Sequence, residues 1–288
     1  MSAFDEPVRL SVALITRNRP GLLQRCLESL RAQEEQPFEI VVSDDSEDQF
    51  ASETREIAGR FDCRYVRGPG GGLYANRNFA ALQCKGTHIR TMDHDHTFPP
   101  GHLARCLAAV RGDPQAIWTT GEITYMDGEV YYQTERAAQL HPSGVGGPVA
   151  DPDDNWAVAD GSTIYPRGIF DKGARMVEDY QYGSSYLEFG AYTYALGFRS
   201  RCVPGAMVEH HADRGMLERA GDPGVMESLL YASLSYNLCF RPNRFLAFKY
   251  SMAHFRESGF SMRLLGRIPA LAAKARARWG ATSPRASA

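Results

Sequence analysis

The sequence predicts an α/β fold whose central sheet is mostly parallel and flanked by helices. Short apolar runs alternate with helical patterns through residues 1–120, and this order implies right-handed crossovers between parallel strands. Polar clusters follow several of the predicted strands, at the edge where doubly wound sheets bind ligands. The composition, 43% hydrophobic and 23% charged in 288 residues, is that of an ordinary globular protein.

Apolar or β-branched runs predict the strands of the first half at residues 10–15, 39–42, 63–66, 88–92 and 116–120. Apolar residues at three- and four-residue spacing predict helices after Pro20, at 51–60 and 74–84, and after Pro99. In the second half, Asp127-Gly128 between residues 123–126 and 130–133 predicts a hairpin, and residues 198–203 and 206–209 are further candidate strands.

These elements suggest three parts: an α/β half at 1–120, a mixed half of the same domain at 121–240, and a basic helical extension at 241–288. In the extension a single acid, Glu257, is set against ten cations, which are Arg241, Arg244, Lys249, Arg256, Arg263, Arg267, Lys274, Arg276, Arg278 and Arg285. The extension fits either contact with an anionic membrane surface or a packed helix with a solvated face.

Charge and cysteine content narrow the class of protein. A net charge of -2 gives no field that would attract nucleic acid, and no apolar run reaches the length of a transmembrane helix. The first residues are polar and acidic, unlike a signal peptide. Six cysteines without a CxxC pair suggest buried thiols in a reducing compartment. We therefore expect a cytoplasmic protein, with peripheral contact at the inner membrane face as the alternative.

The segment Asp93-His94-Asp95-His96 follows the predicted strand at 88–92. Alternate residues of an extended chain share a face, so Asp93 and Asp95 are expected on one face and the two histidines on the other. Two converging carboxylates repel each other unless a cation joins them. Hard oxygen ligands suit Mg²⁺ or Mn²⁺, so this segment is a candidate metal site, although a solvated polar turn would have the same sequence.

Three further features surround the predicted edge of the sheet. Asp44-Asp45 ends the second strand, where a carboxylate could bind a base or a ribose, or could cap the following turn. The run from Gly70 to Gly72 permits close approach of a ligand to the backbone. Arg77 lies one turn into the next helix and could reach a phosphate.

Together these motifs resemble the family 2 glycosyltransferases of the GT-A fold, which have a Rossmann-like sheet. The motifs occur in the family's order and at its spacing: LITRNRP at 14–20, EIVVSDDS at 39–46, GGL at 71–73, RN at 77–78, MDHD at 92–95 and PP at 99–100. The resemblance implies an inverting, metal-dependent transfer of a sugar from a nucleotide-diphosphate sugar to the hydroxyl of a glycan, a lipid-linked acceptor or a small molecule.

The resemblance implies that residues 1–120 bind the nucleotide-sugar donor and that residues 121–240 bind the acceptor. It also implies roles for single residues on the donor side. Thr16 and Arg17 would line the nucleotide pocket, and Asp44 would hold the base. Gly72 would lie against the donor and Arg77 would close the pocket. Asp93 would contact the ribose or the metal, and Asp95 would bind the metal. The turn after Asp45 lacks the glycine that is common in the family.

The acceptor side departs from the family pattern, because Ser185-Tyr186 replaces the usual Glu-Asp pair. Glu188 is the nearest carboxylate and the preferred candidate for the catalytic base, with Asp179 and Glu178 as rivals. In related enzymes a histidine after a late strand completes the metal shell, which here would be His210 or His211, but not both, since neighbours on a strand face opposite ways. His210 and His211 are the last two residues of the segment VEHH at 208–211.

Two alternatives belong to other functional classes. A sugar nucleotidyltransferase shares the sheet type and paired carboxylates, but it usually has a glycine-rich loop after the first strand, and residues 16–20 lack glycine. A non-catalytic relative that binds a nucleotide sugar would explain the missing Glu-Asp pair.

Overall fold

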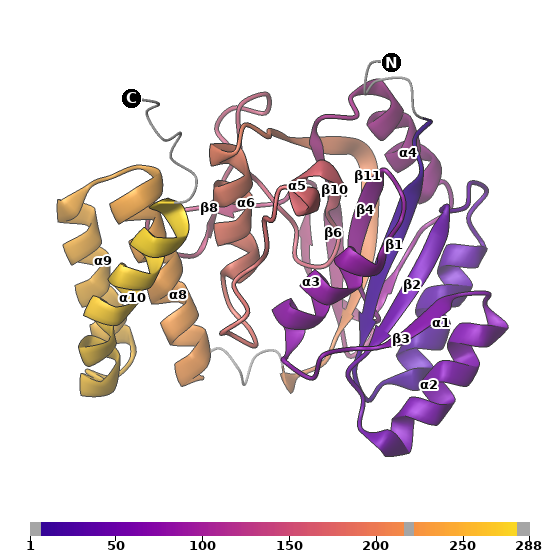
Figure 1. Ribbon diagram of the computed structural model, residues 1–288, viewed down its shortest axis with the longest axis horizontal. Helices are drawn as coiled ribbons and strands as arrows, with labels where there is room; N and C mark the ends of the chain where they lie inside the picture. The colour runs from indigo at the N-terminus through magenta and orange to yellow at the C-terminus, as the bar shows by residue number, and fades with distance from the viewer. Residues whose placement is uncertain (1–6, 216–221, 281–288) are drawn as a thin grey trace. The chain divides into compact units, whose positions relative to one another are not determined.

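The computed structural model describes residues 7–215 and 222–280 (Figure 1). The chain divides into two compact units. Unit 1 consists of Met1–Ala137, Ala159–Arg175 and Arg201–Asp213, and unit 2 of Ala138–Val158, Met176–Ser200 and Arg214–Ala288. The division into donor, acceptor and extension parts concerns function and stays a prediction.

Unit 1 contains the large sheet and the helices that cover it. Its elements in chain order are β1 (Leu10–Thr16), α1 (Pro20–Arg31), β2 (Glu39–Asp44), α2 (Asp48–Arg60), β3 (Arg64–Arg67), α3 (Leu73–Gln83), β4 (His88–Asp93), β5 (His96–Thr97), α4 (His102–Gly112), β6 (Ile117–Met126), β7 (Glu129–Thr134), β10 (Ile164–Pro166), α5 (Gly168–Asp171) and β11 (Ser200–Ala212), whose first residue is counted in unit 2. The strands and helices expected in the first half are therefore confirmed.

The sheet has the strand order β3-β2-β1-β4-β10-β6-β11-β5, with β7 paired to β6. Strands β3, β2, β1 and β4 are parallel to one another, whereas β10 is antiparallel to both β4 and β6. The sheet is thus parallel where it is built from crossover units and mixed in the second half, as the sequence predicts.

Side-chain alternation along β1 determines which face meets which helices. Leu10, Val12 and Leu14 enter one buried core, to which α1 contributes Leu23 and Leu27. Helix α3 contacts β1, β2 and β4 and lies in front of the sheet in Figure 1. Both faces of the central strands are covered, which leaves their carboxyl ends as the accessible edge.

The predicted hairpin joins β6 and β7. Asp127 and Gly128 both have positive φ, 54° and 85°, as a tight two-residue hairpin turn requires. The candidate strands at 116–120 and 123–126 form the single strand β6, and those at 198–203 and 206–209 form the single strand β11.

Unit 2 is mainly helical. It contains the short pair β8 (Gln139–Leu140) and β9 (Gly146–Gly147), then α6 (Ser185–Ala195), α8 (Pro223–Ser235), the π-helical turn η2 (Tyr236–Phe240), α9 (Arg244–Glu257) and α10 (Met262–Gly280). Leu230, Leu234, Leu264 and Leu271 form part of its core. No helix among the described residues is long and apolar enough to cross a bilayer.

Candidate functional site

Three polar strand ends meet at one edge of the sheet in unit 1. In the parallel register Thr16 pairs with Asp44, and Ile15 pairs with Asp93. The ends of β1, β2 and β4 therefore lie side by side, as the alternation of strands and helices predicts.

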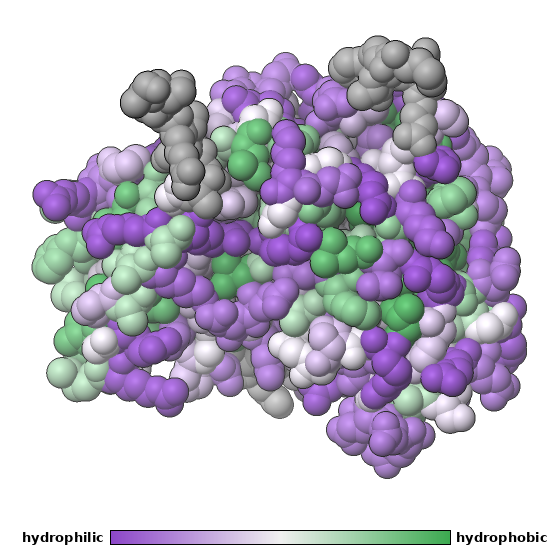
Figure 2. Space-filling view, in the orientation of Figure 1, coloured by the Kyte–Doolittle hydropathy of each residue, from purple (hydrophilic) through white to green (hydrophobic). Residues whose placement is uncertain are grey.

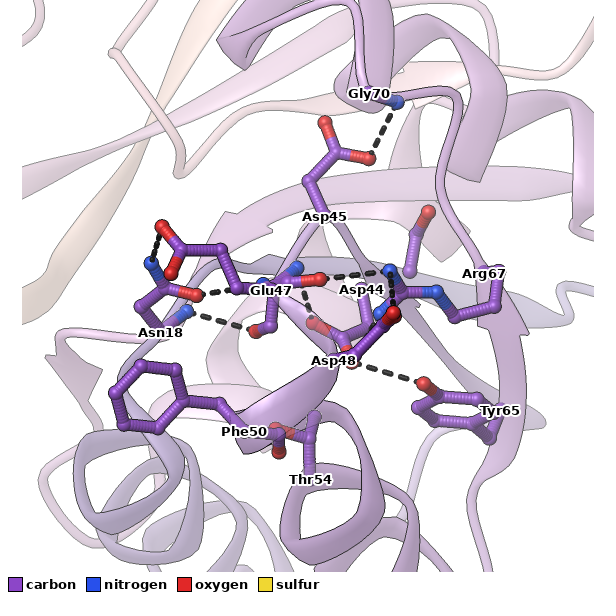
Figure 3. Close-up of polar contacts among 12 residues, drawn as sticks. Asn18, Asp44, Asp45, Glu47, Asp48, Phe50, Thr54, Tyr65, Arg67 and Gly70 are labelled. Atoms are coloured by element: carbon purple, nitrogen blue, oxygen red, sulfur yellow. Dashed lines mark hydrogen bonds and ion pairs between the residues drawn. The ribbon is translucent and has the colours of Figure 1, made fainter.

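Asp44 is fully buried at the end of β2, and both of its oxygens accept hydrogen bonds (Figure 3). Its Oδ1 accepts from the Ser46 backbone N–H at 2.8 Å. Its Oδ2 accepts from the Tyr65 hydroxyl at 2.8 Å and from Arg67 Nη1 at 3.2 Å. Asp44 therefore anchors the turn after β2, while the next residue, Asp45, is half-buried and accepts from the Gly70 N–H at 2.9 Å.

The end of β1 is tied to this turn. The Asn18 backbone N–H donates to Ser46 Oγ at 2.7 Å, and Asn18 Oδ1 accepts from the Glu47 N–H at 2.8 Å (Figure 3). Beside it, Thr16 is 2% exposed and its hydroxyl has no hydrogen-bond partner among the described residues, whereas Arg17 is exposed. A buried hydroxyl without a partner is a group that a bound ligand could satisfy.

Gly72 lies directly before α3 with φ of 95°, a conformation that favours glycine. Arg77 follows in α3 and is 1% exposed. Its Nε and Nη2 donate to the two oxygens of Asp93 at 3.2 and 2.5 Å, and its Nη1 donates to Asp160. Arg77 thus holds Asp93 in a two-point ion pair, a geometry that fixes the orientation of a carboxylate.

Asp95 does not share the partners of Asp93 but lies beside two histidines. Strand β4 ends at Asp93, residues 94 and 95 form a turn, and β5 begins at His96. Strand β11 pairs with β5 so that His210 lies opposite His96. His210 Nε2 lies 3.6 Å from Asp95 Oδ2, and His96 Nε2 lies 3.9 Å from Asp95 Oδ1.

One potential ligand atom from each of Asp95, His96 and His210 lies within 4.8 Å of the others. We call these three residues the metal cluster. Asp95 Oδ1 and His96 Nδ1 are buried with no hydrogen-bond partner among the described residues. One carboxylate and two imidazoles are a common donor set for a divalent transition metal such as Mn²⁺. The residues of the metal cluster therefore fit a bound metal ion.

Glu122, from β6, orients His210. Its Oε1 lies 3.0 Å from His210 Nδ1, so that Nε2 faces Asp95. Metal-bound histidines usually have such a carboxylate on the other ring nitrogen. Burial alone would lower the pKa of His210, but the carboxylates of Asp95 and Glu122 raise that pKa to about 10. This position therefore stabilises positive charge.

The carboxyl group of Asp95 responds in the opposite sense. Burial would raise its pKa, but His210, together with His96 and His94, holds that pKa well below its usual value. Asp95 is therefore a charged carboxylate beside imidazoles, which is the protonation state in which a carboxylate can bind a metal ion.

The structure places His96 and His210, but not His211, beside Asp95. The sequence placed His96 on the face opposite Asp95, which is wrong because the turn at residues 94 and 95 breaks the strand alternation. Of the neighbours His210 and His211, only one faces Asp95, as expected. His211 instead lies 2.8 Å from Thr97 Oγ1 and stacks on Tyr125.

The candidate bases lie in unit 2. Glu188 is fully buried in α6. Its Oε1 accepts from Arg278 Nε at 2.9 Å and from Trp279 Nε1 at 2.8 Å, and its Oε2 accepts from Arg278 Nε at 3.2 Å. Asp179 is exposed and forms an ion pair with Lys274, and its neighbour Glu178 is also exposed.

Sequence reasoning missed Glu122, Asp160 and Gly161. Glu122 stands between two predicted strands, and a single acid there carries no spacing signal. Asp160 and Gly161 precede β10, in a segment without a recognisable motif. Gly161 has φ of 68°, and a Cβ added there would lie 2.7 Å from Asp93 Oδ2 and 3.0 Å from His96 Cε1.

Comparison with known proteins gives a family match. Residues 11–173 match Glycosyl transferase family 2, which is more than half of the chain and includes the strand ends described above. A comparison with curated proteins finds no match.

Solved structures resemble the chain in fold. A structure of GalNAc-T7 with UDP, GalNAc and Mn²⁺ has a TM-score of 0.70 at 17% identity, covering 96% of this chain and 55% of that one. Staphylococcus aureus TarS 1-349 in complex with UDP-GlcNAc has a TM-score of 0.62 at 18% identity, covering 96% of this chain and 82% of that one. The likeness confirms the GT-A fold, and the chain spans only about half the length of the GalNAc-T7 chain.

We predict that Glu122→Gln weakens the binding of Mn²⁺ about 10- to 100-fold, because the charge that orients His210 is lost. Isothermal titration with Mn²⁺ and a nucleoside diphosphate measures the effect. Glu129→Gln, an exposed acid on the paired strand β7, is the matched control and should bind as the unchanged protein does. Equal affinities in both variants would remove Glu122 from the metal site.

We also predict that Gly161→Ala disturbs the site more than backbone strain alone explains. The matched control is Gly205→Ala, since Gly205 has φ of 67° but open space around its Cβ. The control should lose about 1–2 kcal/mol of unfolding free energy from left-handed strain. Gly161→Ala should lose more and also bind Mn²⁺ more weakly, as its methyl displaces Asp93 or His96. Urea unfolding and metal titration test this, and identical behaviour of the two variants would contradict it.

Proposed function

We propose that this chain, which belongs to glycosyl transferase family 2, transfers a sugar from a nucleotide-diphosphate sugar to an acceptor hydroxyl. The transfer would use a bound Mn²⁺ or Mg²⁺ ion and would invert the configuration at the sugar carbon. The observation that carries the proposal is the metal cluster Asp95, His96 and His210, in which Asp95 Oδ1 and His96 Nδ1 are buried without a hydrogen-bond partner among the described residues. The UDP, UDP-GlcNAc and Mn²⁺ of the similar structures support the same donor class.

A metal ion held by Asp95, His96 and His210 would supply positive charge to neutralise the departing diphosphate. His211 stays the second choice for a histidine ligand, and Asp93 acts from beside the metal cluster, because both of its oxygens are held by Arg77. We propose that this fixed carboxylate orients the ribose of the donor.

The nucleotide would lie along the strand ends of β1 and β2. The unsatisfied Thr16 hydroxyl and the exposed Arg17 side chain are available to it. The buried Asp44 shapes this pocket through the turn that it anchors. Gly72, without a side chain, leaves room before α3. We propose that Arg77 closes the pocket through the position it gives to Asp93 and Asp160.

The catalytic base would take the proton from the acceptor hydroxyl, and Glu188 and Asp179 are its candidates. Protonating Glu188 would weaken its charge-assisted bonds with Arg278 and Trp279. Asp179 is 61% exposed and can be approached by an acceptor. These contacts favour Asp179 and suggest that Glu188 stabilises the packing of α6 on α10.

A thermal-shift panel of nucleoside diphosphates and their sugars, with and without Mn²⁺, tests the donor side. A ligand at about 100 times its Kd stabilises the folded protein by about 2.7 kcal/mol, enough for a shift of a few degrees. We predict that this shift needs the metal and disappears in Asp95→Ala. Glu53→Ala, an exposed acid on α2, should keep it.

Product analysis decides between the functional classes. A glycosyltransferase releases a nucleoside diphosphate, whereas a nucleotidyltransferase would release pyrophosphate. Donor binding without turnover of any acceptor or of the donor itself would mark a non-catalytic relative. Full turnover by Asp95→Ala in the presence of a chelator would refute metal dependence, and NMR of the anomeric proton tests inversion.

For the catalytic base, we predict that two isosteric substitutions affect different quantities, one the stability and the other kcat. Glu188→Gln should lower the unfolding free energy by about 3 kcal/mol, because it removes the buried negative charge of the Glu188–Arg278 ion pair. Asp179→Asn should change stability by less than about 1 kcal/mol and reduce kcat by about 100-fold or more. Glu178→Gln is the control for Asp179. Normal stability with a large loss of kcat in Glu188→Gln would return the role of base to Glu188.

A further inference from the structure

The orientation of helix α9 in unit 2 is unusual for an amphipathic helix. The side chains that it buries are small or polar, namely Ala247, Ser251 and His254. Its large aromatic side chains point outward instead, with Phe245 72% and Phe248 66% exposed. A helix normally buries its apolar face, so a helix with exposed phenylalanines indicates a second apolar environment.

The apolar surface continues into the turn after α9. Phe260 is 63% exposed and has φ of 60°, a conformation that is costly for a bulky residue. Its ring packs edge-on against Phe255 with centroids 5.5 Å apart. Met262, the first residue of α10, is 70% exposed. We call these five residues the aromatic stripe: Phe245, Phe248, Phe255, Phe260 and Met262.

Cations surround the aromatic stripe. The exposed cations are Arg244, Lys249, Arg256 and Arg263, and among the described residues none of them has a carboxylate within ion-pair distance. Other cations of the same segment are neutralised inside unit 2, because Arg267 pairs with Glu227 and Arg278 pairs with Glu188. The unpaired positive charge therefore lies next to the exposed phenylalanines. Figure 2 shows hydrophobic and hydrophilic residues interspersed on the side where Figure 1 draws α9.

We propose that the aromatic stripe and its cations bind the surface of an anionic lipid bilayer, with α9 lying in the plane of the interface. Phenylalanine and methionine side chains would enter the boundary between headgroups and acyl chains, and the cations would contact lipid phosphates. A second copy of the chain fits less well, since two such surfaces would bring four unpaired cations against four others. A bilayer with anionic headgroups offers both the apolar layer and the opposite charge.

The chain offers a comparison surface in unit 1. Strand β7 exposes Val130, Tyr131 and Tyr132, but its exposed neighbours Asp127 and Glu129 are acidic. An anionic bilayer would repel this surface. Large apolar side chains are thus exposed in both places, and the sign of the surrounding charge distinguishes the two surfaces.

The experiment is co-sedimentation of the full chain with vesicles of phosphatidylcholine alone or mixed with phosphatidylglycerol. The unchanged protein should bind the mixed vesicles and lose binding as salt is added. The double variant Phe245→Ser with Phe248→Ser, and separately Lys249→Glu with Arg256→Glu, should each reduce partitioning at least ~10-fold. The matched control, Tyr131→Ser with Tyr132→Ser, should bind normally.

Circular dichroism and thermal unfolding verify that each variant is folded, which is expected since all changed side chains are exposed or lie on the outer face. Three results would overturn the proposal: no binding to mixed vesicles, equal binding to neutral vesicles, or equal losses in the control. A fourth contradicting result would come from size-exclusion chromatography with light scattering. If the unchanged protein is a dimer and the double variant Phe245→Ser with Phe248→Ser is a monomer, the surface binds a second copy of the chain. None of these readouts depends on sugar transfer.

Discussion

The site in unit 1 depends on one backbone pairing, that of β11 with β5. This pairing sets His210 opposite His96 and Glu209 opposite Thr97, although the two strands are more than a hundred residues apart in the chain. The His211 N–H adds a bond to the Asp95 carbonyl at 2.9 Å, which fixes the turn between β4 and β5. Two strands of opposite direction thereby bring three candidate ligand groups together, and Glu122 on β6 contacts the last of them, His210.

The two acids of the Asp93-His94-Asp95 segment have different surroundings and therefore different uses. Asp93 is held by the guanidinium of Arg77, which Asp160 also contacts. Asp95 faces imidazoles that suit a metal ion. Asp93 and Asp95 each contact a basic side chain, Arg77 and His210 respectively, and removing one member of such a buried pair leaves the other without its counter-charge.

Local sequence patterns predicted much of this arrangement. Short apolar and β-branched runs located the strands, and the polar segment that follows the strand at 88–92 singled out Asp95 as a candidate ligand. The orientation of His96 could not be predicted, because it depends on a two-residue turn that ordinary polar residues form. The contact of Glu122 with His210 depends on the order of strands in the mixed half, which local patterns do not encode. The outward direction of Phe245 is likewise a result of tertiary packing, since the same residues would read as a buried helix face.

The close fit around Gly161 has a consequence for how such a site can change over generations. The left-handed backbone and the missing side chain at this position leave no space beside Asp93 and His96. A mutation that enlarges residue 161 can persist only if its neighbours shrink or shift at the same time. Substitutions at these three positions are therefore expected to depend on one another, whereas the exposed Arg17 side chain can change without such compensation.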